Sequence, residues 1–228
     1  RQYEVLLEEA GEQMAGSIKR HMNTSVSYLE GMAEVFGEFE DIHSEEALRC
    51  LERVSQKSDY SRMWLTKVDG SAISSEGSIT NASGRAYLAS GRRGESGISE
   101  VQLSIVHEGE QNVVIYAPIT RKGEITGLII GIYSLDKLSD ITDVEIFSGQ
   151  GYSHIFKSDG AVIGLSKHEE RLLQPGDNLV DYLGTVPLRN PESYRKLKED
   201  LLRSGSGVIA YSPDHLMHYG YYCPIGIN

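Results

Sequence analysis

Arg85 is the side chain in this sequence that is best suited to binding a charged ligand. It begins a short segment, 85–90, that is typical of one helical turn closed by Gly91. A guanidinium group presents several donors in a planar fork and binds a carboxylate through two hydrogen bonds at once. We therefore interpret Arg85 as a ligand-binding residue. The alternative is an ordinary salt bridge on the surface or between domains.

Two aromatic side chains are candidates for the wall of the same site. Trp64 is the only tryptophan, and it lies in a predicted strand at 60–67. The two-residue period of a strand places it on one face together with Arg62 and Thr66. Tyr116 lies in a predicted central strand. Both rings are equally suited to plain core packing, so both interpretations stay open for them.

The sequence contains no pattern that indicates catalysis or metal binding. Four histidines match no spacing of metal ligands: His154, His168, His215 and His218. The serine in GLSK, at 164–167, is not in a G-x-S-x-G turn, and the glycines at 204–207 are too few to hold a phosphate. We therefore predict no cofactor, no metal and no enzymatic activity for this part of the protein.

Three strand-like runs after Arg85 build the sheet that would hold a ligand. They lie at 98–106, 112–119 and 125–135, and a tight polar turn joins the last two. Antiparallel strands alternate their faces, so such a meander forms one curved sheet with a concave face for a small molecule. Upstream, Asp69-Gly70 predicts a hairpin turn after the strand of Trp64.

A long helix precedes these strands. Apolar side chains recur at steps of three, four or seven between residues 3 and 39, and Gly37 is a plausible terminator. The apolar stripe is wider than a coiled-coil seam, which favours a spine that supports two domains over a coiled-coil stalk. Ser44 is the predicted N-cap of a second helix that runs to about Gln56.

The pattern of strands and helices restarts near residue 150. Asp159-Gly160 predicts another hairpin, and Pro191 begins an amphipathic helix that ends at Arg203 with Asn190 as its N-cap. Two more strands are predicted at 205–212 and 218–228, and a short helix at 135–142 marks the boundary. The chain therefore contains two related α+β units.

Composition narrows the class of protein. The chain has 228 residues, 39% of them hydrophobic and 24% charged, with a net charge of −11. This is a globular composition, and the absence of a basic stripe argues against a nucleic-acid partner. No apolar run approaches the ~20 residues of a membrane helix.

Cys50 and Cys223 are predicted to be unpaired thiols. The sequence opens within a helix and stops within a strand, which favours a piece of a longer protein.

Three segments, in this order after a long helix, resemble the double Cache (dCache) family of bacterial extracytoplasmic sensor domains. GRAYLASGRRGESGISEV at 84–101 resembles the family's Arg-x-aromatic segment and the strand after it. YAPITRKGEITGLIIGIYSLDKLSDI at 116–141 resembles the hairpin that follows. GYSHIFKSDGAVIGL at 151–165 resembles the opening of the family's second unit.

The resemblance implies an α+β fold in which a long N-terminal helix supports two PAS-like antiparallel-sheet units. We place the helix at 1–42, the membrane-distal unit at 43–142 and a C-terminally truncated, membrane-proximal unit at 143–228. It also implies a bacterial cell-membrane receptor with this part outside the cytoplasm. Flanking helices would supply the membrane contact, and a cytoplasmic output domain such as a histidine kinase or diguanylate cyclase would lie beyond this chain. Whether the receptor is a homodimer stays open.

In the family, an arginine at the position of Arg85 binds the carboxylate of amino-acid ligands, and Tyr87 matches the aromatic residue after it. Gln102 stands where a tyrosine is frequent, and Tyr133 stands where an aspartate binds the amino group. A ligand with an uncharged amine, a pure carboxylate or another small metabolite is therefore expected. The candidate ligand-binding residues are Trp64, Arg85, Tyr87, Gln102, Ser104, Tyr116 and Tyr133. The proximal unit has no counterpart of Arg85, so no site is expected there.

The function that these observations favour is ligand sensing, with a small molecule in the distal unit changing how the sheet packs on the helix. Such a ligand must bind one of two conformations more tightly than the other. The alternative is a PAS- or GAF-like regulatory or dimerisation module without a ligand. A hydrolase is the third interpretation, and the lack of an acid–base pair disfavours it.

Overall fold

The fold was taken from a computed structural model. It describes residues 2–99, 101–134, 140, 151–165, 172–174 and 177–226. The chain divides into two compact units. We call them the seven-stranded unit, residues 22–137, and the C-terminal unit, residues 138–227 together with 1–21. The short helix predicted at 135–142 lies almost entirely outside the described residues.

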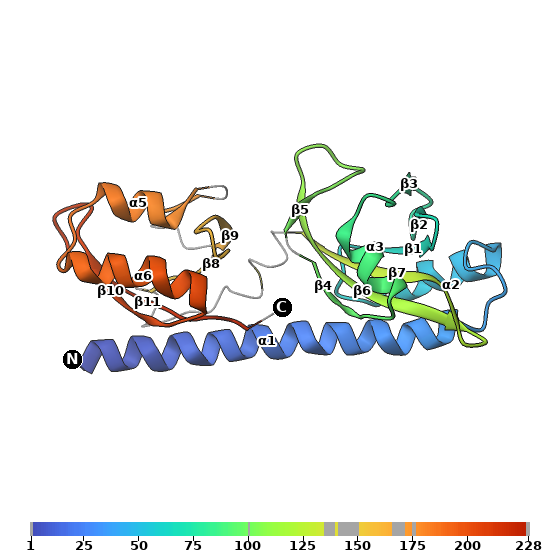
Figure 1. Ribbon diagram of the computed structural model, residues 1–228, viewed down its shortest axis with the longest axis horizontal. Coiled ribbons are helices and arrows are strands. Elements are labelled where there is room, and N and C mark those ends of the chain that lie inside the picture. Colours follow the sequence, from blue (N-terminus) through green and yellow to red (C-terminus); the bar gives the residue numbers. More distant parts are fainter. Residues whose placement is uncertain are drawn as a thin grey trace. The chain divides into compact units, whose positions relative to one another are not determined.

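The predicted long helix is confirmed as α1, which runs from Gln2 to Phe36 (Figure 1). Its first 20 described residues belong to the C-terminal unit and the rest to the seven-stranded unit. The apolar stripe is buried, and Leu29 and Phe36 are fully inaccessible to solvent. The helix ends just before Gly37, where a side chain would collide with the backbone oxygen of Thr120, 2.4 Å from an added Cβ.

The seven-stranded unit contains one antiparallel sheet in the order β3-β2-β1-β7-β6-β4, with β5 also paired to β6. Its strands are β1 Arg62–Lys67, β2 Ser71–Ser74, β3 Ile79–Asn81, β4 Gly97–Ile98, β5 Gln102–Leu103, β6 Gln111–Arg121 and β7 Glu124–Ser134. The predicted tight turn joins β6 and β7 through Lys122 and Gly123, which have positive φ angles of 51° and 83°. Such turns match the twist of a hairpin.

Two helices accompany this sheet. α2, Glu45–Ser55, begins after Ser44, whose hydroxyl accepts a hydrogen bond from the backbone N–H of Ala47 at 3.3 Å, so the predicted N-cap is confirmed. α3, Ala86–Arg92, begins after Arg85. Gly91 was expected to end this helix, but it lies within it. Its role is close packing, since an added Cβ would lie 2.3 Å from a methyl group of Leu128.

The single strand predicted at 98–106 is instead two short strands, β4 and β5. Side-chain hydroxyls explain where the pairing changes. Ser99 Oγ accepts a hydrogen bond from the backbone N–H of Val114 at 3.0 Å. Ser104 Oγ accepts from the backbone N–H of His107 at 3.0 Å and closes a turn after β5. Serine hydroxyls compete with the backbone ladder in this way, and the sequence pattern did not reveal it.

The described residues of the C-terminal unit form two hairpins and two helices, besides the first part of α1. Its elements are β8 His154–Phe156, β9 Val162–Leu165, α5 Leu179–Thr185, α6 Pro191–Arg203, β10 Gly207–Tyr211 and β11 His218–Tyr222. Asn190 caps α6 as predicted, accepting from the backbone N–H of Glu192 at 3.0 Å. α5 was not predicted. The last strand ends at Tyr222 rather than continuing to 228, and Pro224 follows, which cannot donate to a ladder.

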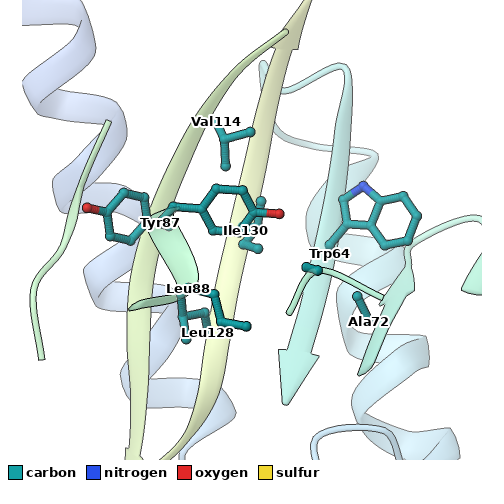
Figure 2. Close-up of a cluster of buried hydrophobic side chains, with 9 residues drawn as sticks. Trp64, Ala72, Tyr87, Leu88, Val114, Leu128 and Ile130 are labelled. Atoms are coloured by element: carbon teal, nitrogen blue, oxygen red, sulfur yellow. The ribbon is translucent and has the colours of Figure 1, made fainter. Parts of the chain in front are cut away.

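The core of the seven-stranded unit lies on both faces of its sheet. One face carries the cluster shown in Figure 2, which includes Trp64, Tyr87 and Ile130. Tyr133 of β7 points to the other face, where its hydroxyl contacts Ser25 of α1. In Figure 2, α1 passes behind the sheet. Along each central strand, successive side chains therefore point to opposite faces of the sheet.

Candidate functional site

A cavity lies over the face of the sheet that carries Trp64. It encloses about 490 Å³ of empty space, its open mouth included. The floor is apolar and comes from Trp64, Ala72, Val114, Ile130 and Ile132. The rim is formed by the start of α3 and by the segment from Gln102 to Val106. This mixture of apolar floor and polar rim is typical of a small-molecule site.

The structure brings together five of the seven residues that the sequence identified. Trp64, Arg85, Tyr87, Gln102 and Ser104 all line the cavity. They come from β1, α3 and the region of β5, so residues 40 positions apart in the chain meet at one place. Burial of the Tyr87 ring raises the pKa of its hydroxyl, which therefore stays protonated at neutral pH.

Tyr116 lies beside the cavity and not in its wall. It packs against Tyr87 with a distance of 6.1 Å between ring centroids, and its ring lies against Gly97. It therefore supports Tyr87 from the side of β6. Its part in the site is indirect, through the position of its neighbour.

The position expected for Tyr133 is corrected by the structure. Its side chain is 2% exposed and lies on the α1 side of the sheet, where its hydroxyl is 3.0 Å from that of Ser25. Ile130 and Ile132 of the same strand line the cavity, so Tyr133 has the opposite parity. Tyr133 therefore contacts the helix and not the ligand space.

Arg85 carries a positive charge that no described acid neutralises. Its guanidinium donates to the side-chain oxygen of Gln102 at 3.0 Å and to the backbone oxygen of Leu103 at 3.0 Å. Both acceptors are neutral, and no ion pair of Arg85 is found in the described part of the chain. The salt-bridge alternative is thus not supported there. A cation bound only by neutral groups at a cavity rim is suited to an anionic ligand.

Arg62 is a second cation at the cavity. The sequence had predicted only that it shares one face of a strand with Trp64. One guanidinium nitrogen lies 2.7 and 2.6 Å from the two carboxylate oxygens of Glu110. The Arg62 side chain is 13% exposed, so the pair is largely shielded from water. Glu110 therefore neutralises Arg62, which leaves Arg85 as the cation available to a ligand.

Thr66 is a lining residue that the list of candidates missed. It lies two residues after Trp64 on the same face of β1, and the alternation of the strand was the signal that could have found it. Its hydroxyl oxygen and the indole nitrogen of Trp64 are both buried, and neither has a hydrogen-bond partner in the structure.

Other kinds of site find little support in the described part of the chain. No group of three or more His, Cys, Asp or Glu side chains there could hold a metal ion. His218 pairs with Asp214 at 3.0 Å, whereas His168 lies outside the described residues. No described helix is long and apolar enough to cross a membrane. Both cysteines are free thiols, as predicted.

The C-terminal unit has an open depression among its described residues. Asp177, Asn178, Asp181, Tyr182 and Thr185 line it together with Leu173. None of these side chains is a cation that could take the role of Arg85.

No protein-family model and no curated protein matches the sequence. Solved structures do match the fold. The ligand-binding domain of the amino-acid chemoreceptor PctB of Pseudomonas aeruginosa PAO1, in complex with L-Arg, has a TM-score of 0.67 at 19% identity. The match covers 96% of this chain and 80% of that one.

Two further structures agree. The extracellular domain of the putative histidine kinase mmHK1S-Z3 has a TM-score of 0.68 at 14% identity, covering 98% of this chain and 91% of that one. The ligand-binding domain of the Pseudomonas fluorescens chemoreceptor CtaA, with L-serine, has a TM-score of 0.68 at 16% identity, covering 93% and 86%. The chain therefore has the fold of chemoreceptor ligand-binding domains and histidine kinase extracellular domains, as its resemblance to the double Cache family predicts.

Proposed function

We propose that this chain is the ligand-sensing, extracytoplasmic domain of a transmembrane signalling receptor. The cavity of the seven-stranded unit binds a small molecule whose carboxylate is held by Arg85. The observation that carries this proposal is the guanidinium of Arg85 at the cavity rim, which among the described residues is bound to neutral oxygens. Structures with the same fold were solved with L-Arg, L-serine and GABA, each of which contains a carboxylate.

Within this proposal the seven-stranded unit belongs to the membrane-distal domain, 43–142, and the hairpins of the C-terminal unit to the membrane-proximal one, 143–228. An incoming carboxylate competes with Gln102 and Leu103 for the donors of Arg85. β5 then loses or rearranges its hydrogen bonds with Arg85. The ligand thus favours one arrangement of the cavity rim over another, which is the differential affinity that a signal requires.

The path from the cavity to α1 is short. Ile132 of β7 lines the cavity, and the next residue, Tyr133, contacts Ser25 of α1. A displacement of β7 by the ligand therefore moves a group that is hydrogen-bonded to the helix. Because α1 runs on from this contact into residues of the C-terminal unit, it is the element that would transmit the change.

The test is binding of small carboxylates to wild type, Arg85→Ala and Arg85→Lys, by thermal-shift screening followed by titration calorimetry. A ligand at 100 times its Kd should stabilise wild type by about 2.7 kcal/mol. Arg85→Ala should weaken a hit by about 2–5 kcal/mol, which is thirtyfold or more. Arg85→Lys should recover only part of the affinity, because an ammonium group lacks the planar fork.

Arg93→Ala is the matched control, since Arg93 is also next to α3 but pairs with Glu95 on the surface at 2.8 Å. This variant should bind as wild type does. If Arg85→Ala binds within about threefold of wild type, Arg85 is a structural residue and the carboxylate site is wrong. If no small molecule binds at all, the ligand-free regulatory module becomes the better interpretation.

A further inference from the structure

Two buried hydrogen-bonding groups on β1 have no partner among the residues that the structure describes. They are Nε1 of Trp64 and the hydroxyl oxygen of Thr66. The two residues are 5% and 0% exposed, so bulk water does not supply the missing bonds. More than nine in ten buried polar groups in proteins are hydrogen-bonded, and an exception calls for an explanation.

Both unpartnered groups belong to side chains that line the cavity. Trp64 and Thr66 are two residues apart on one strand, and both point to the cavity face of the sheet. Figure 2 shows the indole of Trp64 with its nitrogen on the edge of the ring away from Ala72. A ligand in the cavity is therefore the partner that we consider for both groups.

We propose that Trp64 and Thr66 form the second polar half of the ligand site and bind an oxygen atom of the ligand, while Arg85 binds its carboxylate. The ligand class is a small oxo- or hydroxy-carboxylate without an ammonium group. This inference rests on the proposed function and specifies the ligand that the site takes.

The chemistry of the two groups determines what they bind. An indole N–H is a donor only, and a threonine hydroxyl donates equally well, so a keto or hydroxyl oxygen satisfies both. An ammonium group has only donors and would leave Trp64 unpaired. Among the described lining residues there is no Asp or Glu to neutralise an ammonium, and Glu110 is already paired with Arg62.

The order of strands separates the two halves of the site. Trp64 and Thr66 lie on β1, whereas Arg85 is bonded to residues of β5. β7 and β6 lie between them, and their contributions to the cavity include Ile130 and Val114. Three strand spacings are about 14 Å along the sheet, part of which the side chains fill. The ligand therefore needs a short apolar body between its two polar ends.

The experiment compares four acids of one chain length: pentanoate, 2-oxopentanoate, 4-oxopentanoate and 2-aminopentanoate. Each is titrated by calorimetry into wild type, Trp64→Phe and Thr66→Val. 4-Oxopentanoate, which has two methylene groups between its carboxylate and its keto group, should bind wild type roughly tenfold or more tightly than pentanoate, the effect of one satisfied buried donor. Each variant should reduce this advantage to within about threefold. The amino acid should bind no more tightly than pentanoate.

Tyr133→Phe is the matched control, because it removes a polar group from the other face of the same sheet. It should keep the full preference for the oxo acid. Thr66→Val also provides a measurement without ligand. Replacing an unpaired buried hydroxyl by a methyl group of the same shape should leave the melting temperature equal or higher.

The outcomes separate this inference from the proposed function. If pentanoate binds in an Arg85-dependent manner but as tightly as both oxo acids, the carboxylate site stands and the role of Trp64 and Thr66 is wrong. If 2-aminopentanoate binds as tightly as the best oxo acid, the inference that the site excludes an ammonium group is wrong. A fall in the melting temperature of unliganded Thr66→Val by several degrees would show a structural partner and also overturn the inference. If no carboxylate binds wild type, both proposals fail together.

Discussion

The hydroxyl groups of Ser25 and Tyr133 lie 3.0 Å apart in a buried contact between α1 and the last strand of the seven-stranded sheet. Tyr60 adds to it, because its hydroxyl donates to the backbone oxygen of Ser25 at 2.7 Å. The rings of Tyr60 and Tyr133 pack with 5.0 Å between their centroids. Burial raises the pKa of both tyrosines, so both hydroxyls remain protonated at neutral pH. This polar contact holds the helix against the sheet one residue away from the cavity.

Tyr133→Phe should lower the free energy of unfolding by about 0.5–1.5 kcal/mol, because it removes a buried hydrogen bond and leaves the ring. The measurement is urea denaturation followed by circular dichroism. Tyr28→Phe is the control, since Tyr28 lies on the same helix but is 38% exposed, and its change should stay within about 0.5 kcal/mol. Equal stabilities for the two variants would contradict a structural role for the Ser25–Tyr133 contact.

Two glycines of α1 should respond in opposite directions to alanine. An added Cβ at Gly31 meets nothing within 4 Å, so Gly31→Ala should stabilise the protein by about 0.5–1 kcal/mol through helix propensity. The same atom at Gly11 would lie 2.5 Å from the ring of Tyr221, so Gly11→Ala should destabilise by about 1–3 kcal/mol.

Thermal or chemical denaturation of the two variants, side by side, measures this difference. Both substitutions gain the same intrinsic helix propensity, so each is the control for the other. Stabilisation by Gly11→Ala would mean that Tyr221 does not pack on this part of α1.

Cys223 should react slowly with alkylating agents at neutral pH. Burial raises the pKa of its thiol to about 11 from 9.0, and the nearby charge of Glu12 adds to the shift. In a Cys50→Ser variant, the rate of alkylation by iodoacetamide should keep rising with pH beyond 9, because the thiolate is the nucleophile. Glu12→Gln should lower the apparent pKa in part, since burial remains. A rate that levels off near pH 9 would show that Cys223 is solvated.

The raised pKa of Cys223 also makes the stability of the folded protein depend on pH. The folded state holds the thiol proton more tightly than the unfolded chain does. This contribution is therefore fully present below pH 9 and is lost as the pH rises from 9 through about 11. Cys223→Ser should flatten the decline of the melting temperature in that range. An unchanged decline would show that other groups, such as the tyrosines, cause the loss of stability.

The sequence by itself determined the parts of this protein that depend on local chemistry. The periodicity of residues 3–39 predicted α1, the hydroxyl of Ser44 predicted the start of α2, and Lys122-Gly123 lies in the tight turn predicted after β6. A repeat of apolar residues, a cap and a turn are each set within a few neighbouring residues, so they can be read without knowledge of distant contacts. The position of Arg85 beside a short helix was predicted for the same reason.

Only the tertiary structure decided which side chains meet in the cavity. Both faces of β7 are buried and apolar, so the sequence did not reveal that Ile132 faces the ligand space and Tyr133 faces α1. The pairing of Arg62 with Glu110 joins residues 48 positions apart. Thr66 became a candidate only when burial showed that its hydroxyl has no partner. Charge balance and hydrogen-bond satisfaction are properties of the packed chain, because they depend on which distant groups share the same shielded space.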